Sequence, residues 1–331
     1  MLYLNSFKKL GSFKKLGFAI VASASFFAIA SPTLASQESN KSALTDEEIV
    51  VIGQKKRLAE FRELIATQFN VSGGSRQTGQ YPRFAAPVCP SVAGLSERQG
   101  SAIEDRIRQI ARMAEIPTAA EDCRPNLFVA VVEDGKAEIQ LLRKKKNRLF
   151  ASLSHSKRDA MEQSGGPVYS WKSVETMGSD SRYNAAGGTF TFMADTNGPG
   201  GGPALGGAQV NGQRTQVKSR IARSTIEGIG FSYLLIESDA LKGISAAQLA
   251  DYAAMVSLID IDVSSKANVP AGSILALFSA TEDKEQLPQS LSEGDLLLLK
   301  GLYKVPANVD APLQRSAMLH TMNEAASTEG K

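Results

Sequence analysis

The chain opens with an export signal, which constrains the fold most because it removes the first residues from the folded protein and sends the rest to an oxidising compartment. An apolar run over residues 16–30 follows four lysines and precedes small residues at 33–35 that suit a signal peptidase. The run of about fifteen residues is shorter than the roughly 20 that span a bilayer. We expect cleavage after Ala35 and a periplasmic or secreted protein without a transmembrane span.

Removing the leader changes the charge balance. The whole chain has 37 Lys and Arg against 34 Asp and Glu, and four of these lysines lie in the leader, so the mature chain has 33 against 34, a net charge of −1. Nucleic-acid-binding proteins concentrate positive charge on one face. The dense basic run here, residues 143–148 (RKKKNR), is typical of a solvated helix face, so we expect no nucleic-acid partner.

The mature chain has two cysteines, Cys89 and Cys123. In an oxidising compartment we expect them to form a disulfide. In the chain-entropy model, a disulfide that closes a loop of this length stabilises the folded state by roughly 4 kcal/mol. Because the chain has no C-x-x-C motif, a structural bond is favoured over a redox pair.

Composition divides the mature chain into three regions. Residues 36–82 are predicted to be a flexible N-terminal segment, with an extended stretch at residues 48–54 (EIVVIGQ), a short helix and a linker rich in Gly, Ser and Gln. A single domain is expected over residues 83–305, and a C-terminal helix and tail over 306–331. The domain contains a glycine-rich insertion at 197–212, which fits no phosphate-binding motif but could form a mobile loop over a groove.

The apolar runs of this domain predict its strands. Residues 126–132 are typical of a central strand, whereas 168–176 and 189–193 alternate and suit half-exposed strands. Residues 220–226 and 229–236 flank Glu227-Gly228 and predict a hairpin. The expected fold is therefore α+β, with a mostly antiparallel or mixed sheet and packed helices.

Three helices are predicted from one start signal, a serine at the N-cap with an amide or acidic residue three positions later. The pairs are Ser96 with Gln99, Ser245 with Gln248, and Ser292 with Asp295.

Catalytic and metal motifs are absent from the sequence. The two histidines, His155 and His320, do not form H-E-x-x-H, and we expect no zinc site and no cofactor. Residues 154–157 fit S-x-x-K, but the accompanying K-T-G is missing. The acidic residues after the second capped helix, Asp251, Asp260 and Asp262, lack the spacing of a calcium loop. A non-enzymatic protein is therefore favoured, with no catalytic residue assigned.

Several segments resemble a group of secreted alphaproteobacterial proteins of unassigned function. The segments are VCPSVAGL (88–95), CRPNLFV (123–129), QLADYAAM (248–255), ILALF (274–278) and GDLLLLKGLY (294–303). More distantly, the order of the last three is similar to zincin-like domains, which implies a degenerate zincin-like fold. Where such a peptidase presents its glutamate and histidines, this chain has Ala250, Asp251, Tyr252, Ala253 and Ala254, so the resemblance implies a lost zinc site.

The stretch EIVVIGQ resembles the TonB box of outer-membrane receptors, which binds its partner by strand addition. Its residues are Glu48, Ile49, Val50, Val51, Ile52, Gly53 and Gln54. The alternative is that they pair with the protein's own sheet. Two functional hypotheses follow: a non-enzymatic periplasmic or outer-membrane-associated binding or accessory protein, which we favour, and a zincin-like hydrolase or pseudopeptidase.

Overall fold

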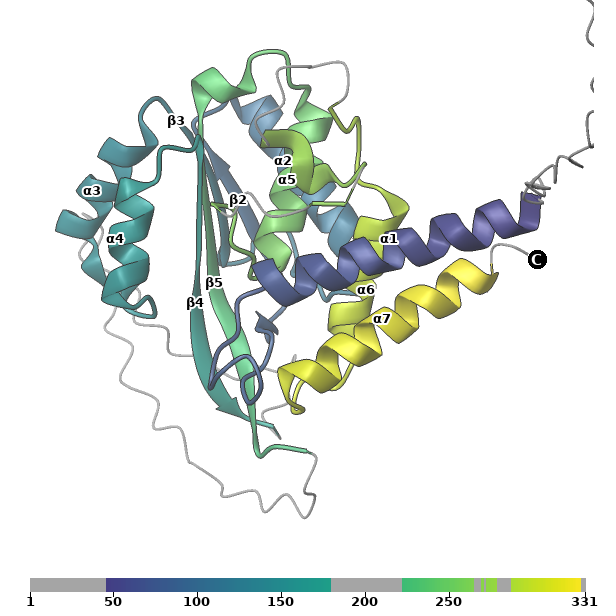
Figure 1. The fold of residues 1–331 in the computed structure, drawn as a ribbon. Helices are drawn as coiled ribbons and strands as arrows, with labels where there is room; N and C mark the ends of the chain where they lie inside the picture. Colours follow the sequence, from purple (N-terminus) through teal and green to yellow (C-terminus); the bar gives the residue numbers. More distant parts are fainter. Residues whose placement is uncertain (1–45, 180–221, 265–268, 271, 279–286, 329–331) are drawn as a thin grey trace, which may run out of the picture. The chain divides into compact units, whose positions relative to one another are not determined.

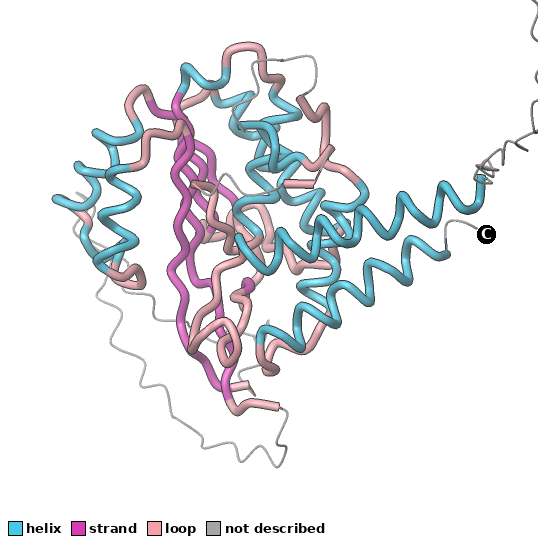
Figure 2. Tube along the Cα trace, in the orientation of Figure 1, coloured by secondary structure: helices cyan, strands magenta, loops and turns pink. Residues whose placement is uncertain are grey.

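The structure is a computed structural model that describes residues 46–179, 222–264, 269–270, 272–278 and 287–328. The predicted leader, the strand expected at 189–193 and the glycine-rich insertion at 197–212 lie outside these residues. In the described part, one sheet lies between two layers of helices (Figures 1 and 2).

The sheet is built around its longest strand, β5. Strands β1 and β3 pair with β5 in parallel, β1 near its start and β3 along its second half, and β2 pairs in parallel with β3. Strand β4 pairs with β5 antiparallel along the opposite side. The strands are β1 (Arg83–Phe84), β2 (Pro90–Ala93), β3 (Leu127–Val132), β4 (Val168–Gly178) and β5 (Thr225–Glu237).

The mostly parallel sheet makes this an α/β fold, so the prediction of an α+β fold with a mostly antiparallel or mixed sheet is wrong. The predicted hairpin is the source of the error. Strand β5 runs straight through Glu227-Gly228, where Gly228 pairs with Arg83 on one side and with Glu175 on the other. A helix, not a tight turn, joins β2 to β3, as parallel pairing requires.

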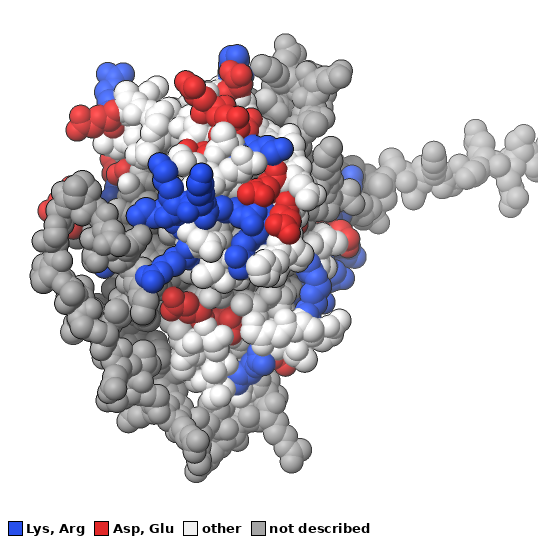
Figure 3. Space-filling view, turned by 90° about the vertical axis from the view of Figure 1, so that its left-hand side faces the viewer, with Lys and Arg blue, Asp and Glu red and all other residues white. Residues whose placement is uncertain are grey.

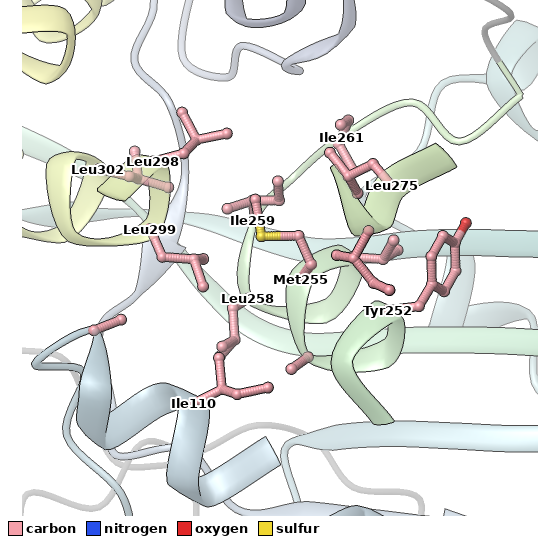
Figure 4. Packing of buried hydrophobic residues seen from close by; sticks show 14 of the residues in the cluster. Ile110, Tyr252, Met255, Leu258, Ile259, Ile261, Leu275, Leu298, Leu299 and Leu302 are labelled. Atoms are coloured by element: carbon pink, nitrogen blue, oxygen red, sulfur yellow. The ribbon is translucent and has the colours of Figure 1, made fainter. Parts of the chain in front are cut away.

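Five helices cover one face of the sheet and enclose the main core. In Figure 4, Ile110, Met255, Leu258 and Leu299 lie close together, and all four are fully buried. The predicted capping boxes at Ser245 and Ser292 are confirmed. These helices are α1 (Asp46–Gln68), α2 (Glu97–Met113), α5 (Ala246–Leu258), α6 (Glu293–Lys304) and α7 (Ala311–Thr328).

The other face carries α3 (Gly135–Lys145), the 3-10 helix η1 (Asn147–Phe150) and α4 (His155–Gln163). A smaller core of stacked aromatic rings holds them to the sheet: Trp171 of β4 has its ring centroid 4.9 Å from those of both Phe150 and Tyr233. The Trp171 indole also donates a hydrogen bond to the carbonyl of Leu149 at 3.1 Å.

Helix α1 differs from the expected flexible N-terminal segment. Its backbone is helical through residues 48–54, where an extended stretch was predicted, and Phe61, Leu64 and Ile65 are buried in the main core. The packed unit therefore includes residues before Arg83. Once the buried half of a helix is in place, extending it is cheaper than starting a new one, which accounts for helical residues at β-branched positions.

The predicted disulfide is confirmed, with 6.0 Å between the Cα atoms of Cys89 and Cys123. Cys89 immediately precedes β2, and its N–H donates to the side chain of Asn126, next to β3, at 2.8 Å. The disulfide thus joins the segments that precede the two paired strands β2 and β3. No helix among the described residues is long and apolar enough to cross a membrane.

Candidate functional site

Asp251 of α5 lies in the segment where a lost zinc site was predicted, and it has a structural role. Its carboxylate is 1% exposed and accepts hydrogen bonds from Arg106 Nε at 2.6 Å and Nη2 at 3.2 Å. It also accepts the N–H of Leu291 at 2.7 Å. Both oxygens are therefore used to connect α5 with α2 and with the start of α6.

Asp295 of α6 has a similar role. The buried carboxylate accepts the Ser273 hydroxyl at 2.5 Å, and the N–H groups of Ile274 and Ser292 at 2.9 and 3.0 Å. Burial raises the pKa of Asp295, and the hydrogen bonds oppose that shift. The segments ILALF and GDLLLLKGLY are thus connected in this chain, because Asp295 of the second caps the 3-10 helix η3 (Ile274–Phe278) that forms the first.

The remaining side chains of α5 are also unavailable for chemistry. Every residue from Gln248 to Leu258 is buried, including Ala250, Tyr252, Ala253 and Ala254. Within the described ranges, no group of three or more His, Cys, Asp or Glu side chains is placed to hold a metal ion. A site must be sought elsewhere.

A pocket of about 330 Å³ lies beside β4. One wall comes from α4 and the loop before it, and the other from residues 70–72 and 260–264. The strand itself contributes residues 168–172 and Val174. The second wall is held together by an antiparallel bridge, because Phe69 pairs with Ile261.

Lys172 of β4 lines this pocket and is 3% exposed. Its ammonium donates to the Ser170 hydroxyl at 2.9 Å, and no described carboxylate forms an ion pair with it. Burial lowers the pKa of Lys172 to about 8, and the negative charge of Asp260 only partly opposes this shift. Near neutral pH the pocket therefore holds a buried cation. Its ammonium can donate three hydrogen bonds, but among the described residues it has one acceptor, the Ser170 hydroxyl.

Asn70 connects the two walls of the pocket. Its amide donates to Asp260 Oδ1 at 2.9 Å, and its carbonyl oxygen accepts the Lys157 ammonium at 3.1 Å. Ser152 crosses to the strand, where its hydroxyl donates to the carbonyl of Lys172 at 2.8 Å. The polar groups around Lys172 are thus partly held in position, as a preformed binding site requires.

Some residues that the sequence analysis singled out lie together in this pocket. Ser154, Lys157, Asp260 and Asp262 all line it, although Ser154 caps α4 by accepting the N–H of Lys157 at 3.3 Å. The two histidines lie elsewhere. His155 is exposed at the start of α4, and His320 pairs with Glu324 on α7 at 3.2 Å.

Lys172 and Asn70 were not predicted as site residues from the sequence. One feature of the sequence indicated that Lys172 is buried. In the predicted strand at 168–176, Lys172 falls on the same face as Val168, which is apolar and buried, and Ser170. A lysine on an inward face of a strand is unusual enough to suggest a function.

Comparison of the chain with protein-family models, curated proteins and solved structures found no match. The function must therefore be inferred from the pocket.

Proposed function

We propose that this protein is a non-enzymatic binding or accessory protein of the cell envelope, and that the pocket beside β4 binds a small organic acid. The observation that carries the proposal is Lys172, a buried ammonium that lines the pocket and has no carboxylate partner within the described ranges. An ionised lysine is rarely buried unless it is paired. A carboxylate in the pocket would supply the missing partner.

The pocket lining favours an acid with an apolar body. Leu153, Met161, Val168 and Val174 contribute apolar side chains, and the polar groups gather around Lys172 and Asn70. Such a lining of apolar side chains with a few placed polar groups is typical of small-molecule sites. The volume also suits a molecule of the size of an acylated amino acid, because it falls within the roughly 300–1,000 Å³ of known ligand pockets.

The ligand class can be tested by thermal-shift and calorimetric titration of the protein with N-acetylated apolar amino acids and their carboxamides. The acids should bind and the carboxamides should not, because only the acids can neutralise Lys172. Lys172→Gln should weaken binding by about 10- to 100-fold, the value of a charged hydrogen bond of about 1.5–3 kcal/mol. Lys300→Gln, outside the pocket, is the control.

Equal binding of acids and carboxamides would contradict this role of Lys172. A complete lack of binding by the acids would contradict the ligand class.

The proposal includes an envelope partner for residues 48–54 by strand addition. Support comes from the composition of this segment: Ile49, Val50, Val51 and Ile52 are β-branched, and the next residue is Gly53, so the first turns of α1 have low helix propensity. Partner binding then requires these turns to unwind.

The resemblance to a TonB box suggests the probe. Binding to the purified periplasmic domain of TonB should be lost with Val50→Pro and Ile52→Pro, because proline removes the N–H groups that a strand needs. Lys55→Gln and Lys56→Gln, next to the segment, are the control. If the proline variant binds as well as the control, strand addition at this segment is excluded.

A further inference from the structure

A second surface gathers positive charge on the layer formed by α3, η1 and α4, and of its cations only Lys157 also lines the pocket. Figure 3 shows Lys and Arg side chains close together on this face. Residues 134–163 contain eight Lys and Arg against four Asp and Glu, a net charge of +4 in a mature chain whose expected net charge is −1. We call this the basic surface; its cations are Lys136, Arg143, Lys144, Lys145, Lys146, Arg148, Lys157 and Arg158.

Acidic residues of this layer are engaged elsewhere than at Lys144 and Lys145. Asp159 and Glu162 pair with the half-buried Arg143 at 3.6 and 2.7 Å, which ties α3 to α4. Asp134 caps α3 by accepting the N–H of Ala137 at 2.8 Å. Lys144 and Lys145 are exposed and appear in none of the ion pairs of the described residues.

An exposed apolar side chain lies within the basic surface. Leu141 of α3 is 42% exposed, and Lys144 and Lys145 follow it by three and four residues, so the three side chains are neighbours on the helix surface. The opposite side of α3 is held by Ile139, which is buried in the smaller core. Cations around an apolar side chain are the pattern of a helix that lies on an anionic lipid surface.

We propose that the basic surface docks the protein on a membrane surface rich in anionic phospholipid, with Leu141 entering the headgroup region. An acidic protein would satisfy the charge equally well but would not need an exposed leucine among the lysines. Charge attraction of this kind weakens as salt shortens its range.

The test is co-sedimentation of the protein, purified after expression of the full chain, with vesicles of phosphatidylglycerol and phosphatidylcholine in a ratio of 3:7. Vesicles of phosphatidylcholine alone are the lipid control. We expect binding to the anionic vesicles only, and weaker binding in high salt. Each lysine near an anionic surface contributes about five-fold to binding, so Lys144→Gln, Lys145→Gln and Lys146→Gln together should weaken it about 100-fold.

A matched variant removes the same charge elsewhere. Lys55→Gln, Lys56→Gln and Lys304→Gln lie outside the basic surface and should bind like the wild type. Leu141→Ser, which changes no charge, should weaken binding without changing its salt dependence. Unfolding temperatures of all variants establish that each is folded.

Equal loss of binding in the two triple variants would overturn the proposal, because net charge rather than the basic surface would then decide binding. Equal binding to both kinds of vesicle would overturn it as well. Binding to soluble polyglutamate but not to anionic vesicles would show that the surface suits an acidic protein instead. None of these outcomes bears on the organic-acid pocket, whose Lys157 and Lys172 are unchanged in every variant.

Discussion

Two regions of the molecule bury charge in opposite ways. Where α5 and α6 start and pack, Asp251 and Asp295 are buried with hydrogen bonds to both carboxylate oxygens. Beside β4, Lys172 is buried with one hydroxyl partner, Ser170, in the part of the chain that the structure describes. The first arrangement stabilises the fold, whereas the second destabilises it. An unmet charge that persists in a pocket indicates a role in binding, and a satisfied one indicates a role in structure.

The largest expected effect concerns Asp295. Asp295→Ala should lower the free energy of unfolding by about 4 kcal/mol, because it leaves the buried N–H of Ile274 and the Ser273 hydroxyl without an acceptor, at about 1–3 kcal/mol for each buried group. Urea unfolding measures the change. Asp295→Asn keeps one acceptor oxygen and should be milder; if both variants unfold like the wild type, Asp295 is not a structural residue.

Replacing Lys172 should change the free energy of unfolding in the opposite direction. Lys172→Met should raise the free energy of unfolding at pH 7 by about 3 kcal/mol, because a pKa lowered from 10.5 to about 8 means that folding disfavours the charged form. Chemical unfolding of both proteins at pH 7 measures the difference. A less stable methionine variant would mean that the ammonium is well satisfied in the fold.

The pH dependence follows from the same shift. Since the unfolded chain keeps the Lys172 proton above pH 8 while the folded protein loses it, stability should rise with pH by about 2 kcal/mol between pH 7.5 and 9.5. Lys172→Met should lack this rise. The series ends below pH 10 because burial raises the pKa of Tyr252 and Tyr303, which opposes the rise at higher pH. If the stability of the wild type and of Lys172→Met changed with pH in the same way, the rise could not be due to Lys172.

Among the three buried charges, the smallest effect is expected for Asp251. Asp251→Ala should lower the free energy of unfolding by about 2 kcal/mol, mainly through the lost acceptor of the Leu291 N–H, because the Arg106 side chain is 32% exposed and can be hydrated instead. Arg106→Gln should be milder still. A larger loss than for Asp295→Ala would reverse the order of the two carboxylates.

Local signals in the sequence predicted local structure well. The helix starts at Ser245 and Ser292 are set by hydrogen bonds within a few residues, and both were predicted correctly. Cys89 and Cys123 could be paired because the predicted leader implies an oxidising compartment and the chain has no other cysteine.

Strand pairing was not predictable in the same way, because the paired strands lie far from each other in the sequence. Nothing local shows that Gly228 sits between β1 and β4 rather than in a turn, and the four-residue strand β2 is too short for a clear pattern. The site was missed for the same reason. Lys172 meets Asp260 and Asn70 only when β4, the end of α5 and the end of α1 come together.

The most direct test of the account is an NMR titration of the Lys172 amine in the ligand-free protein, assigned by comparison with Lys172→Met. The account predicts a pKa of about 8, and a rise in that pKa when an N-acetylated amino acid binds, since a carboxylate favours the charged form. A pKa near the ordinary 10.5 would contradict this prediction, because the Lys172 ammonium would then already be paired with an anion or hydrated by water.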